Sequence, residues 1–171
     1  MGVTYTTSSA ATYEPIQKIT ASGSTGVISF TSIPNTYTDL IIVFNGSQGS
    51  SGTTPIVQMT YNTDAYGASG YSCTTMRGNG SATASGRYGS QWLFVIPLTA
   101  GTQWTDIIQI FNYANTSTYK TALIRHDSDT TVDATVGLWS NTAAINTVTL
   151  STSGGNYNSG STFTLYGIKA A

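Results

Sequence analysis

Short runs of alternating apolar and polar residues recur along this chain, and clusters of glycine, asparagine and serine separate them. Such runs are typical of β-strands, because successive side chains of a strand point to opposite faces of a sheet. No segment carries the i, i+3, i+4, i+7 apolar spacing of an amphipathic helix. The runs predict strands at 16–20, 27–30, 40–44, 56–61, 71–76, 92–96, 106–113, 121–126, 132–139, 145–150 and 162–168.

Many short strands with turn clusters between them indicate an all-β fold, an antiparallel β-sandwich of jelly-roll type with about 8–10 strands. An immunoglobulin-like sandwich is the alternative, although it usually needs only about 100 residues. The continuous apolar runs 40–44 and 92–96 are expected to be central strands buried on both faces. The segments 46–54 and 78–90 are rich in glycine and serine, which predicts surface loops, and the second is expected to be mobile.

The length of 171 residues suits one domain. We expect a single sandwich over 12–171 and a flexible N-terminal arm over 1–11, because the arm carries no packing pattern.

Charged residues are scarce, at 8% of the chain against about 25% in an average soluble domain. The 31 threonines and 21 serines supply hydroxyl groups in place of charge. A neutral surface of this kind produces little repulsion between copies of a protein, so it favours close symmetric packing.

The same composition argues against several classes of partner. The net charge is −1 and the basic residues are scattered, whereas nucleic-acid binding needs clustered Lys and Arg. No apolar stretch approaches the ~20 residues of a membrane span. The first residues have no apolar signal core, so synthesis in the cytoplasm is expected. The single cysteine, Cys73, is interpreted as a small buried apolar residue.

Groups that could perform acid–base catalysis are sparse. His126 is the sole histidine and stands next to Asp127, but adjacent strand residues point to opposite faces. The sequence has no Gly-x-Ser-x-Gly motif that would place a nucleophilic serine. His126 is therefore interpreted as a strand-end histidine near a polar loop, and we expect no enzymatic activity.

The aspartate side chains are also predicted to have structural rather than catalytic roles. Asp39 and Asp106 each stand in a Thr-Asp-apolar context, which predicts a strand-start carboxylate that accepts turn amide hydrogens. Asp127, Asp129 and Asp133 form an acidic cluster that lacks the glycine and terminal glutamate of a calcium loop, so a solvated turn is expected. No cofactor and no metal site are predicted.

Aromatic side chains are the remaining candidates for contacts. Trp92 and Trp139 are expected in the core, whereas Trp104, flanked by polar residues, is predicted to be exposed or at an interface. Tyrosines in or near predicted loops are further candidates for interface or ligand contacts: Tyr66, Tyr71, Tyr88, Tyr119 and Tyr157.

Three parts of the sequence resemble a known group of proteins. The first combines Tyr-Glu-Pro-Ile at 13–16, Phe-Thr-Ser-Ile-Pro at 30–34 and Tyr-Thr-Asp-Leu at 37–40. The second is Gly-Leu-Trp-Ser-Asn-Thr-Ala-Ala-Ile at 137–145, and the third is Phe-Thr-Leu-Tyr-Gly-Ile-Lys at 163–169. Together they are similar to small virion proteins of tailed bacteriophages, many from marine and cyanobacterial hosts.

The resemblance covers most of the chain from Tyr13 onward and implies a β-sandwich component of a virus particle. Some such proteins decorate or cement capsids, and others belong to tails or fibres. We expect a capsid decoration protein on the virion surface, a homotrimer that binds the major capsid protein. The alternative is a tail-fibre or receptor-binding tip that recognises host surface glycans through Trp104 and the loop tyrosines.

Overall fold

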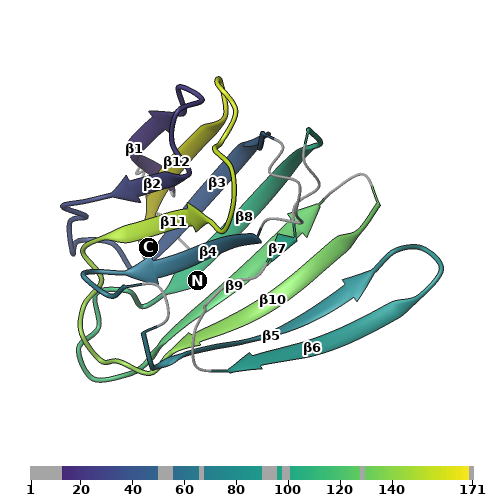
Figure 1. The fold of residues 1–171 in the computed structure, drawn as a ribbon. Helices are drawn as coiled ribbons and strands as arrows, with labels where there is room; N and C mark the ends of the chain where they lie inside the picture. Colours follow the sequence, from purple (N-terminus) through teal and green to yellow (C-terminus); the bar gives the residue numbers. More distant parts are fainter. Residues whose placement is uncertain are drawn as a thin grey trace, which may run out of the picture.

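The computed structural model describes residues 13–49, 56–65, 68–89, 96–97, 101–127 and 130–169 (Figure 1). The predicted arm at 1–11 and most of the predicted strand at 92–96 lie outside these residues. The described residues form β-strands joined by turns and loops: β1 (Tyr13–Thr20), β2 (Val27–Phe30), β3 (Asp39–Ser47), β4 (Ile56–Tyr61), β5 (Tyr71–Gly78), β6 (Thr83–Gly89), β7 (Ile96–Pro97), β8 (Gln103–Phe111), β9 (Lys120–Asp127), β10 (Val132–Trp139), β11 (Val148–Thr152) and β12 (Thr162–Ile168).

The strands make two antiparallel sheets. The large sheet has eight strands in the order β1-β12-β3-β8-β9-β10-β5-β6, and the small sheet has four in the order β2-β11-β4-β7. The chain changes sheet at most connections, but β8, β9 and β10 follow one another as a meander in the large sheet. The predicted antiparallel β-sandwich is confirmed, and the described residues form twelve strands rather than about 8–10.

The core lies between the sheets. Phe30, Met59 and Val148 of the small sheet are fully buried in the same apolar cluster as Leu40 and Ile110 of the large sheet. Such apolar burial is the main force that holds two sheets face to face. The bounds predicted for 27–30, 56–61, 132–139 and 162–168 agree with β2, β4, β10 and β12.

The predicted mobile loop at 78–90 is wrong, because residues 83–89 form β6 and pair with β5 along its length. A tight turn joins the two strands. Asn79 Oδ1 accepts hydrogen bonds from the N–H groups of Ser81 and Ala82, and Gly80 has a φ of 82°. Gly80 and Ser81 are the two central residues of this turn, and glycine at the first central position is a hairpin signal that the abundance of glycine and serine obscured. Likewise, Gly46 and Ser47 belong to β3 rather than to a loop.

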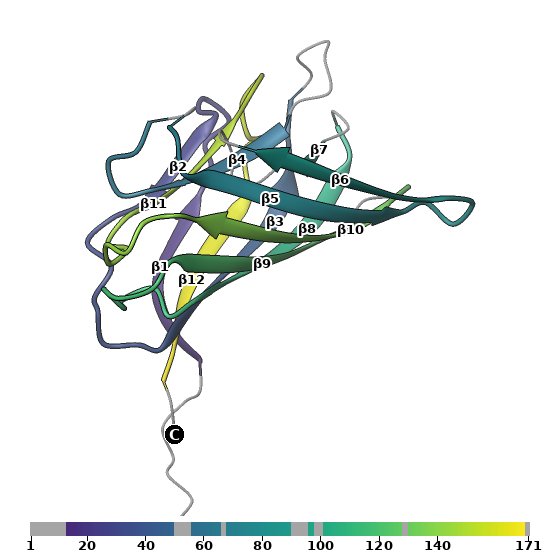
Figure 2. The same cartoon turned by 90° about the horizontal axis from the view of Figure 1, so that it is seen from below.

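The two sheets differ in extent. In both views the small sheet lies over one part of the large sheet, and the β5–β6 hairpin projects beyond it (Figures 1 and 2). One edge of the large sheet therefore stands apart from the core. Among the described residues, no helix is long and apolar enough to cross a membrane.

Candidate functional site

The structure places the predicted contact aromatics in two different environments. Trp104, Tyr71 and Tyr157 are buried, at 5%, 1% and 0% exposure, so the surface position predicted for them is wrong. Trp104 is buried because it shares the inward face of β8 with Ile108 and Ile110. The exposed members of the set are Tyr88 in β6 and Tyr119 just before β9, while Tyr66 lies outside the described residues.

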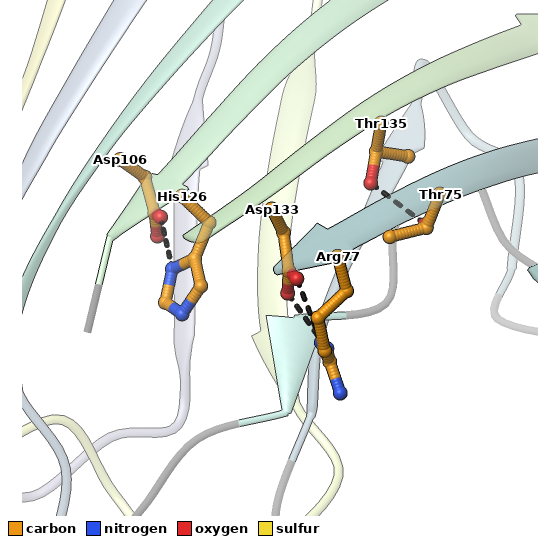
Figure 3. A network of polar contacts seen from close by, with 6 residues as sticks. All are labelled: Thr75, Arg77, Asp106, His126, Asp133 and Thr135. Atoms are coloured by element: carbon orange, nitrogen blue, oxygen red, sulfur yellow. Dashed lines mark hydrogen bonds and ion pairs between the residues drawn. The ribbon is translucent and has the colours of Figure 1, made fainter. Parts of the chain in front are cut away.

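Polar side chains form a row across the inward face of the large sheet (Figure 3). Asp106 of β8 stands opposite His126 of β9, and His126 stands opposite Asp133 of β10. Asp133 in turn stands opposite Arg77 of β5. The antiparallel register alone brings these residues together, since they are distant in the sequence.

The Asp106–His126 pair is deeply buried. His126 Nδ1 lies 2.6 Å from Asp106 Oδ1, and each side chain is 1% exposed. Burial raises the pKa of Asp106, while the hydrogen bond to His126 acts in the opposite direction. Asp106 is therefore not the strand-start carboxylate that the sequence predicted, because it points into the sandwich from within β8.

An aspartate that orients a histidine is also part of a catalytic triad, in which the other ring nitrogen meets a nucleophile. Within the described residues, Nε2 of His126 is buried and has no hydrogen-bond partner. No hydroxyl or thiol of the described residues therefore stands where a nucleophile would. Within the described part of the chain, Asp106 and His126 form a polar contact between β8 and β9.

The rest of the row is also paired across strands. Arg77 donates two hydrogen bonds to Asp133, from Nε at 2.7 Å and from Nη2 at 2.6 Å. Two residues further along the same strands, the hydroxyls of Thr75 and Thr135 lie 2.7 Å apart on the same inward face. These contacts satisfy polar groups that would otherwise be costly to bury, so they allow β5 and β10 to turn polar residues inward.

The acidic cluster predicted from the sequence is divided by the fold. Asp133 points inward to Arg77, whereas Asp127 is exposed, as expected of the residue after the inward-facing His126. Asp129 lies outside the described residues. The solvated turn expected for Asp133 is therefore wrong. Among the described residues, no group of three or more His, Cys, Asp and Glu side chains could hold a metal ion.

The outward face of β10 is apolar, whereas the outward face of a strand in a two-layer sandwich is normally polar. Its inward positions hold Asp133, Thr135, Gly137 and Trp139, and its outward positions hold apolar residues. An outward sheet face is usually polar, because it meets water. The outward row consists of Val132, Ala134, Val136 and Leu138.

This apolar row has one apolar neighbour on each adjacent strand, while the exposed Arg125 and Asp127 of β9 stand opposite Ala134 and Val132 at one end of it. Met76 of β5 stands opposite Ala134, and Leu123 of β9 stands opposite Val136. The exposed fractions are 64% for Met76, 59% for Val132 and 51% for Val136. At this end of the sheet, Met76, Val132 and Ala134 line a hollow together with residues of the inward polar row, Arg77, His126 and Asp133. We call the following six apolar side chains the outer apolar patch: Met76, Leu123, Val132, Ala134, Val136 and Leu138.

The comparisons with known proteins give little guidance. The sequence matches no protein-family model. It also matches no curated protein. Among solved structures, the chain is similar to the crystal structure of a protein of unknown function from Shewanella oneidensis MR-1, with a TM-score of 0.27 and 8% sequence identity. The match covers 93% of this chain and 77% of the other, and a TM-score this low indicates only a loose likeness.

The outer apolar patch was missed at the level of the sequence. Its signal is visible in 132–139, where valine, alanine, valine and leucine occupy every second position. Alternation of this kind reveals the two faces of a strand but not which face points to the core. The apolar face of β10 can point outward only because the polar residues of its other face pair with residues of β5 and β9. The sequence does not show that pairing.

Proposed function

We propose that this chain is a structural protein of a tailed-bacteriophage particle, and that it decorates the capsid by binding the major capsid lattice. The observation that carries the proposal is the outer apolar patch. Contiguous exposed apolar side chains on a folded domain mark surfaces that other proteins cover. The part of β10 that faces solvent is such a surface, with Val132 and Val136 more than half exposed.

The chemistry of the surface suits a lattice of repeated contacts. A specific protein interface buries roughly 1,000 Å² or more, and repetition of a weak contact over a shell adds avidity. Because only 8% of the residues are charged, copies held side by side on a shell repel one another weakly. The resemblance to phage virion proteins supports the same assignment, and the segments that carry it are 13–16, 30–34, 37–40, 137–145 and 163–169. In this proposal the protein acts as a trimer at positions where capsid subunits meet.

A glycan-binding tail tip has less support. Sugar binding commonly uses exposed aromatic rings as platforms, and Trp104 is buried at 5% exposure. Tyr88 and Tyr119 are exposed, but they lie on β6 and just before β9, and no contact joins them. They offer single rings rather than an aromatic groove.

The proposal is tested by adding the purified protein to heads of the parent phage that lack it and examining them by cryo-electron microscopy. Regular density over the lattice is expected. Val136→Lys, which places a charge in the outer apolar patch, should reduce occupancy at least about tenfold, as a cost of about 1.4 kcal/mol implies.

Val27→Lys is the matched control, because Val27 is as exposed as Val136, at 52% against 51%, and lies in β2 of the small sheet. It should leave occupancy unchanged. Density at the tail alone, or no density at all, would contradict capsid decoration. Equal occupancy for Val136→Lys and the unmodified protein would remove the patch from the contact.

A further inference from the structure

The free edge of β6 is an unpaired strand edge at the end of the large sheet. Among the described residues β6 pairs with β5 and with no other strand. Six of its seven residues are exposed, and the hairpin projects from the body of the sandwich (Figure 2). An exposed edge of this length carries a row of unpaired N–H and C=O groups that can pair with another strand.

The opposite edge of the same sheet is protected. β1 carries Pro15, which has no N–H to donate, and its register shifts between Pro15 and Gln17. Lys18 adds a charge to the same strand. Proline, irregular register and lysine are the devices by which proteins prevent edge-to-edge pairing. β6 has none of the three, and Arg87 is its single charged residue.

The hydrogen-bond pattern of the hairpin shows which groups β6 offers. The N–H of Asn79 donates to the carbonyl of Ala82, which stands opposite it at the turn. In an antiparallel ladder, directly hydrogen-bonded pairs alternate with pairs that are not bonded. Residues at even positions of β6 therefore turn their backbone groups toward β5. The N–H and C=O groups that point to the free edge belong to Thr83, Ser85, Arg87 and Gly89.

We infer that β6 pairs antiparallel with β6 of a second copy of this chain, about a two-fold axis at Gly86. This register pairs the whole strand from Thr83 to Gly89. In this register Ser85 forms a hydrogen-bonded pair with Arg87 of the partner subunit. The N–H and C=O groups at the free edge of each chain therefore face those of the other chain. The two large sheets then become one continuous sheet.

The side chains agree with this register. Arg87 meets serine rather than another charge, so no like charges stand opposite each other. On the inward face, Tyr88 lies across Ala84 of the partner subunit. At the axis Gly86 meets the partner's Gly86, where the two strands approach most closely. In the single chain the ring of Tyr88 already lies over Gly86, with its Oη 3.3 Å from the place of an added Cβ.

The inference does not rest on the proposed function, since the edge would pair in the free protein as well as on a shell. A two-fold contact through β6 gives twice the mass of the chain, and a trimer gives three times that mass. Sedimentation equilibrium of the full chain therefore distinguishes the β6 pair from a capsid-type trimer, and failure of either idea leaves the other untouched.

The main test compares Ser85→Lys with Ser85→Glu. Lysine would stand opposite Arg87 of the partner subunit at two symmetric places, so the dimer dissociation constant should rise at least about tenfold. Glutamate at the same place should leave it unchanged or lower it. Ser117→Lys, on the exposed loop before β9, adds the same charge away from the edge and should have no effect.

Two further variants fix the geometry. Ser85→Pro removes an N–H that points to the free edge, which an edge strand tolerates, and should give a monomer. Gly86→Cys places two thiols at a close pair about 4.5 Å apart between Cα atoms, so mild oxidation should cross-link the dimer. A monomer at the highest soluble concentration, or an oligomer that Ser85→Lys and Ser85→Pro leave intact, would overturn the inference.

Discussion

The hydroxyl of Tyr71 lies 2.9 Å from Oδ2 of Asp64 and donates a hydrogen bond to it. The same hydroxyl accepts a hydrogen bond from the backbone N–H of Tyr61, also at 2.9 Å. Oδ2 of Asp64 is shared with Nε1 of Trp139, again at 2.9 Å. Tyr61 ends β4 in the small sheet, whereas Tyr71 and Trp139 belong to the large sheet. These bonds therefore hold the two sheets together at one end of the sandwich.

Tyr71→Phe should destabilise the protein by about 1–3 kcal/mol, because it leaves the buried N–H of Tyr61 without a partner and removes one bond to Asp64. Urea unfolding followed by tryptophan fluorescence measures the change. Tyr88→Phe is the control, since Tyr88 is 46% exposed, and it should stay within about 0.5 kcal/mol of the unmodified protein. Equal stability of the two variants would show that the Tyr71 hydroxyl does not connect the sheets.

Gly167 of β12 lies directly beneath the ring of Tyr37. A Cβ added at Gly167 would stand 2.3 Å from Cγ of Tyr37, so Gly167→Ala must displace the ring. The same ring donates from its hydroxyl to Oε2 of Glu14 at 3.1 Å, and this contact would be lost with it. We expect a loss of about 1–3 kcal/mol in the free energy of unfolding, as for other overpacked sites.

Gly78→Ala is the matched control for Gly167→Ala, because both glycines lie in strands of the large sheet. The nearest atom to a Cβ added at Gly78 is Cγ2 of Val132, at 4.0 Å, which is ordinary contact. Its stability should stay within about 0.5 kcal/mol of the unmodified protein. If both variants lose the same stability, the contact with Tyr37 is not the cause.

The architecture followed from the sequence where the local pattern was strong. The alternation at 27–30, 56–61, 132–139 and 162–168 gave the strand bounds directly, because a period of two is a local property of the chain. The sandwich followed from the number of such runs. The strand β6 was missed because its small polar residues carry no alternation, although Asn79 and Gly80 mark the turn that creates it.

The sites depended on information that no local pattern contains. Asp106 meets His126 only through the register of β8 with β9, and Asp133 meets Arg77 only through that of β10 with β5. The outward direction of Val136 follows from those polar pairs. Trp104 has polar neighbours in the sequence, yet its own position in the strand points inward. The register of a strand and the face to which its side chains point are set by tertiary structure, so candidate site residues could be named from the sequence but not placed.

Deletion of residues 1–11 should leave the sandwich folded, because the buried cluster is built from residues that follow β1 and the partly buried residues packed on it begin at Ile16. The melting temperature of the shortened protein should therefore match that of the full chain. Under the proposed function, its occupancy on phage heads should fall, since an N-terminal arm can bind a neighbouring subunit. A shortened protein that fails to fold would place these residues in the core instead.

The buried carboxyl of Asp106 should make the stability of the protein depend on pH in the acid range. Its pKa is raised in the fold, chiefly by burial, above the ordinary value of about 3.9. At pH values between the ordinary pKa and the raised pKa, the carboxyl of Asp106 therefore binds a proton when the chain folds. The resulting stabilisation is fully present below pH ~4 and is lost as the pH rises through the raised pKa.

Asp106→Asn removes this titration, and its amide oxygen can still accept a hydrogen bond from Nδ1 of His126. The free energy of unfolding of Asp106→Asn, relative to the unmodified protein, should therefore increase as the pH rises from ~4 to ~6. Urea unfolding at several pH values measures the difference. Asp127→Asn is the control, because Asp127 is exposed on the other face of β9, and its difference should not vary in this way. A constant difference for Asp106→Asn would mean that the carboxyl is as easily ionised in the fold as in the unfolded chain, and that His126 compensates fully for its burial.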